Sequence, residues 1–152
     1  MKKTFKLIVS SLFLAIVFTS CTQAQTENKV NAAEVDTYLA IKDALVKSDF
    51  ETTKTLAAKL NGEASEVIKT QATAMAEASD LETQRTAFKS LSDQLLTELE
   101  ASPIAGKPLY KQYCPMAFEN TGAAWVSAQK EVYNPYFGDM MLRCGKMIKE
   151  LK

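Results

Sequence analysis

Proline and glycine are distributed very unevenly along this chain. Residues 30–102 hold one glycine, Gly62, and no proline, whereas residues 103–147 hold all four prolines and four of the five glycines. Proline and glycine are the residues that most disfavour a helix interior. The first stretch, rich in Ala, Leu, Glu, Lys and Thr, therefore predicts a series of helices. The second stretch also contains Trp125 and four of the five tyrosines, and it predicts a compact, irregular segment.

Apolar residues at helical spacing predict four helices in the first stretch. Their expected ranges are residues 31–47, 48–61, 63–78 and 81–101. Ser48 and Ser79 each stand three residues before a glutamate, Glu51 and Glu82, which is the pattern of a capping box at a helix start. Pro103 closes the last helix. The predicted fold class is mostly α: an antiparallel helical bundle, followed by an irregular aromatic- and Cys/Met-rich segment that ends in a short helix.

The N-terminus has the pattern of a bacterial lipoprotein signal. Residues 1–6 are basic, residues 7–18 are apolar, and two small residues precede Cys21. An apolar run of about a dozen residues is too short to span a bilayer, which takes roughly 20. We therefore expect cleavage before Cys21 and a lipid on that cysteine. Phe18 stands where such signals usually carry leucine, and the alternative is an ordinary secretory signal cut nearby, for instance after Ala24.

The predicted organisation is a signal peptide over residues 1–20, a flexible polar tether over residues 21–30 and a single helical domain over residues 31–152. The lipid would anchor the domain to a membrane of the cell envelope, facing the periplasm. Cleavage removes three lysines and no acid from 18 basic and 18 acidic residues, which leaves 15 basic and 18 acidic. This slightly acidic balance argues against nucleic acid as a partner, because a nucleic-acid binder carries a basic surface.

Histidine is absent from the chain. Its absence excludes mechanisms that need an imidazole base, such as the Ser-His-Asp and Cys-His arrangements, and it excludes metal binding through imidazole. The acidic residues are dispersed along the predicted helices without a catalytic partner, which is typical of a solvated face. We therefore predict that the protein is not an enzyme.

Cysteine and methionine occur together twice in the second stretch. Met116 follows Cys114 by two residues, and Cys144 follows Met140 and Met141 by four and three residues. On a short helix these two spacings would place the sulfurs on one face. Two thiolates with one or two thioethers form a soft ligand set, which suits Cu(I) or Ag(I) and suits zinc poorly.

Two alternatives remain open for Cys114 and Cys144. Once Cys21 is lipidated, these two cysteines are the only ones left to pair. In an oxidising compartment a disulfide between them is the ordinary expectation. Spacing alone slightly favours this disulfide. Otherwise the two thiols meet in the fold, with Cys144 on a short helix that begins at Asn134–Pro135, and bind a soft cation. A thiol-redox role is the weakest option, because no Cys-x-x-Cys motif is present.

The chain resembles a family of uncharacterised exported domains, and the specific elements lie in the second stretch. The resemblance rests on three elements in order: Cys-Pro-Met at residues 114–116, Asn-Pro-Tyr-x-Gly at 134–138 and Met-x-x-Cys-Gly at 141–145. It extends over residues 35–148. Such domains occur alone in Bacteroidetes-type bacteria and fused to periplasmic adaptors of copper and silver efflux pumps.

The resemblance implies a periplasmic association with heavy metal, above all copper. Cys114, Met116, Met141 and Cys144 correspond to the family's cysteine and methionine positions and are the expected ligands, with Met140 as a substitute. The chain has no adaptor portion and no histidine, and a sulfur-only site favours Cu(I). We expect a membrane-tethered chaperone or buffer that serves an efflux adaptor or pump protein. The alternative is a disulfide-stapled helical interaction module of the cell envelope without metal.

Overall fold

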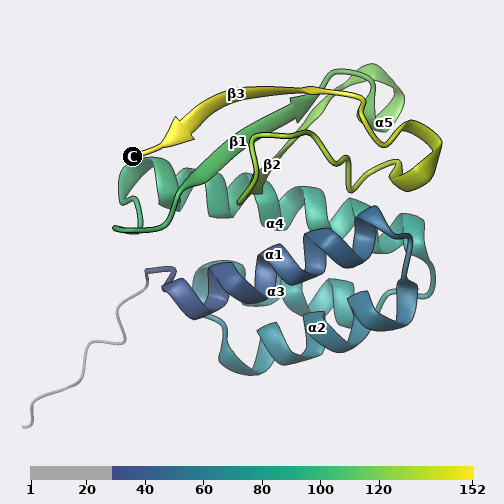
Figure 1. Ribbon diagram of the computed structural model, residues 1–152. Coiled ribbons are helices and arrows are strands. Elements are labelled where there is room, and N and C mark those ends of the chain that lie inside the picture. Colours follow the sequence, from purple (N-terminus) through teal and green to yellow (C-terminus); the bar gives the residue numbers. More distant parts are fainter. Residues whose placement is uncertain (1–28) are drawn as a thin grey trace, which may run out of the picture.

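A computed structural model describes residues 29–152. The predicted signal peptide, Cys21 and nearly all of the predicted tether lie outside the described residues. Four helices come first and a small three-stranded antiparallel sheet follows at the C-terminus. Figure 1 shows the sheet lying over α1 and α4, with α2 and α3 on the side away from it. The prediction of a mostly helical chain is confirmed, and from residue 29 onward no helix has the length and apolarity that crossing a membrane requires.

The helices are α1 (Ala32–Val46), α2 (Phe50–Glu63), α3 (Glu66–Ala76) and α4 (Leu81–Ala101). The bounds of α4 are those that the sequence predicts, whereas α3 is shorter at both ends. The two predicted capping boxes are wrong. Asp49 caps α2 by accepting from the Thr52 amide at 3.0 Å, and Asp80 caps α4 by accepting from Thr83 at 2.7 Å. A carboxylate is the stronger acceptor for a free amide at a helix N-terminus, so the aspartate following each serine takes its place.

The core lies between the helices and against the inner face of the sheet. Successive helices pack on one another, and α4 also packs on β2. The fully buried large side chains of the core come from all four helices and from the sheet. The apolar and aromatic ones are Tyr38, Ile41, Leu45, Leu60, Ile68, Met75, Phe88, Leu91, Leu95, Leu99 and Trp125. The helical region and the sheet therefore share one hydrophobic core.

The C-terminal segment forms strands where the sequence predicts irregular structure. The strands are β1 (Leu109–Cys114), β2 (Ala123–Ser127) and β3 (Lys146–Leu151), and β1 lies in the middle of the sheet. The prediction that this segment ends in a short helix is wrong, because it ends in β3. Its helical pieces within the described residues are α5 (Ala117–Asn120) and a 3-10 helix, η1 (Gly138–Met141).

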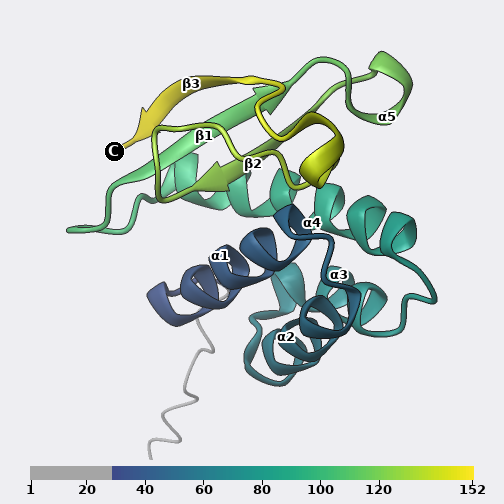
Figure 2. The ribbon, with the colours of Figure 1, turned by 45° about the vertical axis from the view of Figure 1, so that its right-hand side comes forward.

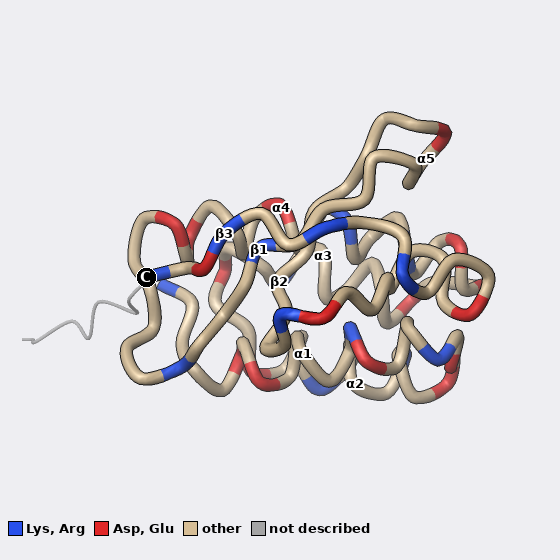
Figure 3. Tube along the Cα trace, turned by 45° about the horizontal axis from the view of Figure 1, so that its top comes forward, with Lys and Arg blue, Asp and Glu red and all other residues tan. Residues whose placement is uncertain are grey.

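The sheet is also the basic side of the fold. Residues 103–152 carry seven basic and four acidic residues, whereas residues 29–102 carry eight basic and thirteen acidic. Figure 3 shows the basic positions along β1 and β3. Glu100 of α4 pairs with Lys111 at 2.9 Å and with Lys149 at 3.2 Å, and these contacts lower the pKa of its carboxyl. The pairs join the end of α4 to β1 and β3.

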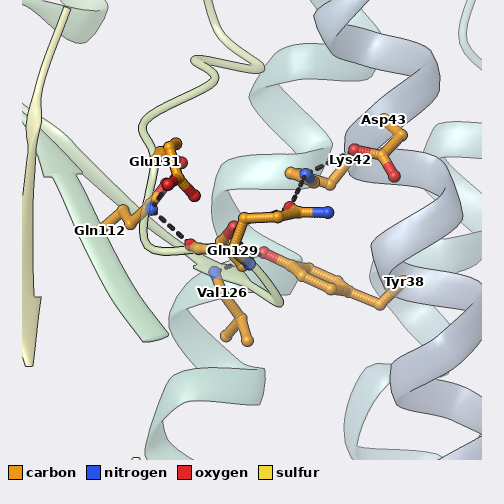
Figure 4. A network of polar contacts seen from close by, with 8 residues as sticks. Tyr38, Lys42, Asp43, Gln112, Val126, Gln129 and Glu131 are labelled. Carbon is orange, nitrogen blue, oxygen red and sulfur yellow. Dashed lines mark hydrogen bonds and ion pairs between the residues drawn. The ribbon is translucent and has the colours of Figure 1, made fainter. Parts of the chain in front are cut away.

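The segment between β2 and β3 is held to the sheet by polar contacts. The Gln112 side-chain amide lies within hydrogen-bond distance of the carbonyls of Gln129, Lys130 and Glu131, at 2.9, 3.1 and 3.0 Å. Figure 4 shows this group beside the buried Lys42, which donates to the Gln129 side chain. These contacts fix the start of the segment that later carries Cys144.

We expect Tyr38→Phe to lower the free energy of unfolding by about 1–3 kcal/mol. The Tyr38 hydroxyl is fully buried, lies 2.7 Å from Ser92 Oγ and accepts from the Val126 amide at 3.1 Å. It joins α1 to α4 through Ser92 and to β2 through Val126, and Figure 4 shows the contact with Val126. Removing it leaves a buried amide unsatisfied, which urea denaturation would measure. Ser92→Ala keeps the Tyr38 hydroxyl as the acceptor for the Val126 amide, and it should have the smaller effect on stability. A Tyr38→Phe protein as stable as the parent would contradict this role of the hydroxyl.

Candidate functional site

The fold brings Cys114 and Cys144 together. Their Sγ atoms lie 2.9 Å apart, and both are free thiols. Cys114 is the last residue of β1, and Cys144 lies two residues before β3. Because β1 and β3 pair, with Tyr113 opposite Lys146, the two cysteines meet at the same end of the sheet. The sequence left this meeting open, and the strand pairing produces it.

Asn134 holds the turn that carries Cys144. Its buried side chain donates to the Cys144 carbonyl at 2.8 Å and accepts from the Tyr136 amide at 2.8 Å. Its main-chain amide donates to the Leu142 carbonyl at 2.9 Å. The prediction that Asn134–Pro135 starts a helix is wrong, because η1 begins only at Gly138. Asn134 instead closes residues 134–144 into a loop. Its position before Pro135 in the sequence does not reveal this role.

Gly145 lets this loop approach β1. Its φ is +129°, and a Cβ built there would lie 2.8 Å from the Tyr113 carbonyl oxygen and 3.2 Å from the Trp125 ring. A side chain at this position would therefore collide with the main chain of the central strand. The glycine that follows Cys144 in the sequence is therefore needed for the close approach of the two strands, independently of any role of the thiol.

The structure does not place Met140, Met141 and Cys144 on one helix face, as the sequence suggests. Met116 and Met140 lie on the surface, with 48% and 77% of their area exposed, and Met141 is half-buried. The helix expected to align Met140, Met141 and Cys144 is one 3-10 turn that ends at Met141, so Cys144 does not share its face. The Cys144 amide does donate to the Met141 carbonyl at 2.9 Å.

The thiol pair can change in two directions. A metal–thiolate bond of about 2.3 Å would place two sulfurs on one tetrahedral ion roughly 3.8 Å apart, whereas a disulfide joins them at about 2.05 Å. The observed 2.9 Å lies between these values. Among residues 29–152 no three His, Cys, Asp or Glu side chains gather as metal ligands. A metal at the pair would therefore take its further ligands from thioethers or have a low coordination number.

The two thiols differ in access and in acidity. Cys114 is fully buried and Cys144 is partly exposed. The hydrogen bond to Cys114, together with burial and the charge of a neighbouring thiolate, raises the pKa of Cys144 to about 11. At neutral pH Cys144 is therefore a thiol, and metal binding or disulfide formation must release its proton.

Alkylation of Cys144 should follow this raised pKa. In a Cys21→Ser background the rate with iodoacetamide is expected to rise toward pH 11 instead of levelling off near the ordinary pKa of 9.0. Because the native thiol keeps its proton where the unfolded thiol loses it, stability should fall as pH rises from about 9 toward 11. Cys114→Ala removes the hydrogen-bond partner and should return the rate midpoint toward 9.0. Identical rate profiles in the two proteins would contradict the pairing.

Residues 35–105 match a family described as Protein of unknown function (DUF3347). The chain thus contains a DUF3347 domain that spans nearly all of α1 to α4 and ends before β1. The matched residues do not include Cys114, Cys144 or the elements around them. No curated protein and no solved structure matches the chain.

Proposed function

We propose that the protein binds a soft metal ion, Cu(I) first and Ag(I) as the alternative, through the thiolates of Cys114 and Cys144. The observation that carries this proposal is that two thiols, thirty residues apart in sequence, meet at one end of the sheet. Thiolate sulfur is a soft ligand that prefers Cu(I) to harder ions. The pair lies at the end of the sheet, where Cys144 is partly exposed, so an ion can reach it from solvent.

Thioethers would complete the metal site. Met116 follows Cys114 by two residues, and the Met141 carbonyl accepts from the Cys144 amide. We assign Met116 and Met141 as the additional ligands, with Met140 as a substitute. Met116 and Met140 are exposed, and exposed thioethers on short turns can rotate toward a bound ion without disturbing the core. This explains how a site without histidine could reach three or four ligands.

The location and partner in this proposal come from the sequence. A lipid on Cys21 would hold the domain at a membrane, facing the periplasm. About ten residues separate Cys21 from the start of α1 at Ala32, and an extended chain of that length reaches roughly 35 Å. Within that distance the domain could pass its ion to an efflux adaptor or pump protein, acting as a chaperone or buffer.

The test is a competition for Cu(I). The full chain with Cys21→Ser, kept reduced, is titrated with Cu(I) against a coloured Cu(I) chelator. We expect one tight equivalent, lost in Cys114→Ser/Cys144→Ser and retained in Met147→Leu, a control that alters an exposed methionine of β3. Uptake that fails in the parent, or that survives the double serine change, would exclude the thiol pair as the metal site.

The second candidate is a disulfide-stapled interaction module without metal. It is favoured by the 2.9 Å separation, which is shorter than that of two sulfurs on one ion, and by the full burial of Cys114. In this case a helical surface would carry the function. Mass spectrometry of protein isolated without reductant, after alkylation, separates the two candidates. A Cys114–Cys144 bond that resists mild reductant supports the module, and two alkylated thiols support the metal site.

A further inference from the structure

We propose that the protein has a second binding site, for an organic cation such as a methylated ammonium group. The site is a cavity of about 310 Å³ whose lining includes residues of both α5 and η1, and this volume is within the range of small-molecule pockets. Figure 2 shows α5 and the yellow turn of residues 138–141 at the same end of the molecule. The cavity is lined by Glu82, Arg85, Phe118, Glu119, Tyr136, Phe137 and Met140.

The apolar lining is aromatic and soft. Phe118 and Phe137 supply two half-buried rings, and the buried Tyr136 packs edge-on against Phe118 with ring centroids 5.3 Å apart. The Met140 thioether adds a polarisable group at the rim, where 77% of its area is exposed. Aromatic rings attract cations through the negative charge of their faces, and methylated ammonium groups are a ligand class that such linings recognise.

The charges of the lining favour a cation. Glu82 and Glu119 form no ion pair with any of residues 29–152. Arg85 is the one basic residue of the lining, and its recorded hydrogen-bond acceptors are neutral oxygens, so its positive charge counts against the two carboxylates. Its Nε donates to the Pro135 carbonyl at 3.0 Å, and its Nη2 donates to Ser48 Oγ at 3.0 Å. The lining therefore has one excess negative charge and two carboxylates available to a ligand.

An unusual backbone turn builds one wall of this cavity. Phe118, Glu119 and Asn120 are consecutive, and all have left-handed conformations, with φ of 52°, 56° and 68°. Residues other than glycine rarely adopt the left-handed conformation, and those that do are normally single residues. Strain of this kind persists where the surrounding structure requires it, often at binding sites. Here the turn places Phe118 and Glu119, a ring and a carboxylate, in the same wall.

The test uses a pair of ligands that differ in charge alone. The full chain, in a maltoside detergent and with Cys114→Ser/Cys144→Ser, is titrated by calorimetry with choline and with its neutral carbon analogue, 3,3-dimethylbutan-1-ol. We expect saturable binding of choline and none of the alcohol. Because the thiols are absent, the result does not depend on the metal site. A second titration uses a peptide that contains trimethyllysine. If the peptide binds and choline does not, the cation belongs to a protein partner.

Variants locate the binding. Glu82→Gln/Glu119→Gln should weaken choline binding about tenfold, whereas Glu63→Gln/Glu77→Gln, which changes two exposed carboxylates elsewhere, should not. Phe118→Leu removes a ring while leaving an apolar side chain, and it should weaken binding in a protein whose thermal unfolding shows it to be folded. Equal binding of choline and the alcohol, no binding of choline or of the peptide, or no effect of the Glu82 and Glu119 changes would overturn the proposal.

Discussion

Gly145→Ala is expected to lower the free energy of unfolding by about 3 kcal/mol. The φ of +129° is unfavourable for alanine, and the new Cβ would lie 2.8 Å from the Tyr113 carbonyl oxygen. That oxygen belongs to the main chain of β1, the central strand, so it cannot move aside as the end of a flexible side chain would. The strain must therefore shift the start of β3 away from β1, and Cys144 with it.

Two measurements check this expectation. Urea denaturation gives the loss of stability, and the rate of Cys114–Cys144 disulfide formation with a mild oxidant gives the separation of the thiols, which should slow the reaction. Gly62→Ala is the matched control. Gly62 lies in α2 with no atom within 4 Å of a built Cβ, so alanine there should raise stability by up to about 1 kcal/mol. A Gly145→Ala protein with parental stability and parental oxidation rate would show that the close approach at Tyr113 is not required.

Oxidation of Cys114 and Cys144 to a disulfide is expected to raise the free energy of unfolding by about 3–4 kcal/mol over the dithiol form. The bond removes two protons and two electrons from the pair and closes a loop between residues thirty apart. In the chain-entropy account this loop restricts the unfolded chain far more than the folded one. The thiols already meet in the fold, so the folded state needs little rearrangement to form the bond.

The measurement is urea denaturation of the Cys21→Ser protein with and without reductant. Cys114→Ala/Cys144→Ala is the control, and its stability should not depend on reductant. Equal stability of the oxidised and reduced protein would mean that the bond strains the fold as much as it restricts the unfolded chain. The result also bears on the proposed function, because an oxidised pair has no thiolate to offer a metal ion, so Cu(I) uptake under that proposal requires the reduced protein.

The helices could be predicted because their signals are local. The long stretch without proline, the apolar spacing of α4 and the stop at Pro103 all act within a few residues, and the bounds of α4 agree with the prediction. The capping residues were mispredicted at α2 and α4 by one position. In both cases a serine and an aspartate are adjacent, and the choice between them depends on which side chain reaches the free amide.

The pairing of the sheet could not be predicted, because its edge strand β3 lacks a local signal. Five of the six residues of β3 are exposed, so β3 shows no alternation of apolar and polar residues. It is a strand because its main chain pairs with β1, and that pairing joins residues more than thirty apart. Strand preference depends on such neighbours more than on the residues themselves.

The sequence by itself determined the four-helix region and the soft side chains of the C-terminal segment. Only the tertiary structure decided that Cys114 and Cys144 meet, that the predicted methionines remain on or near the surface, and that Phe118 and Met140 line one cavity. The physical reason is the range of the interactions. A helix is stabilised by contacts three and four residues apart, whereas the thiol pair depends on a strand pairing, on Asn134 and on a glycine that fits against the neighbouring strand.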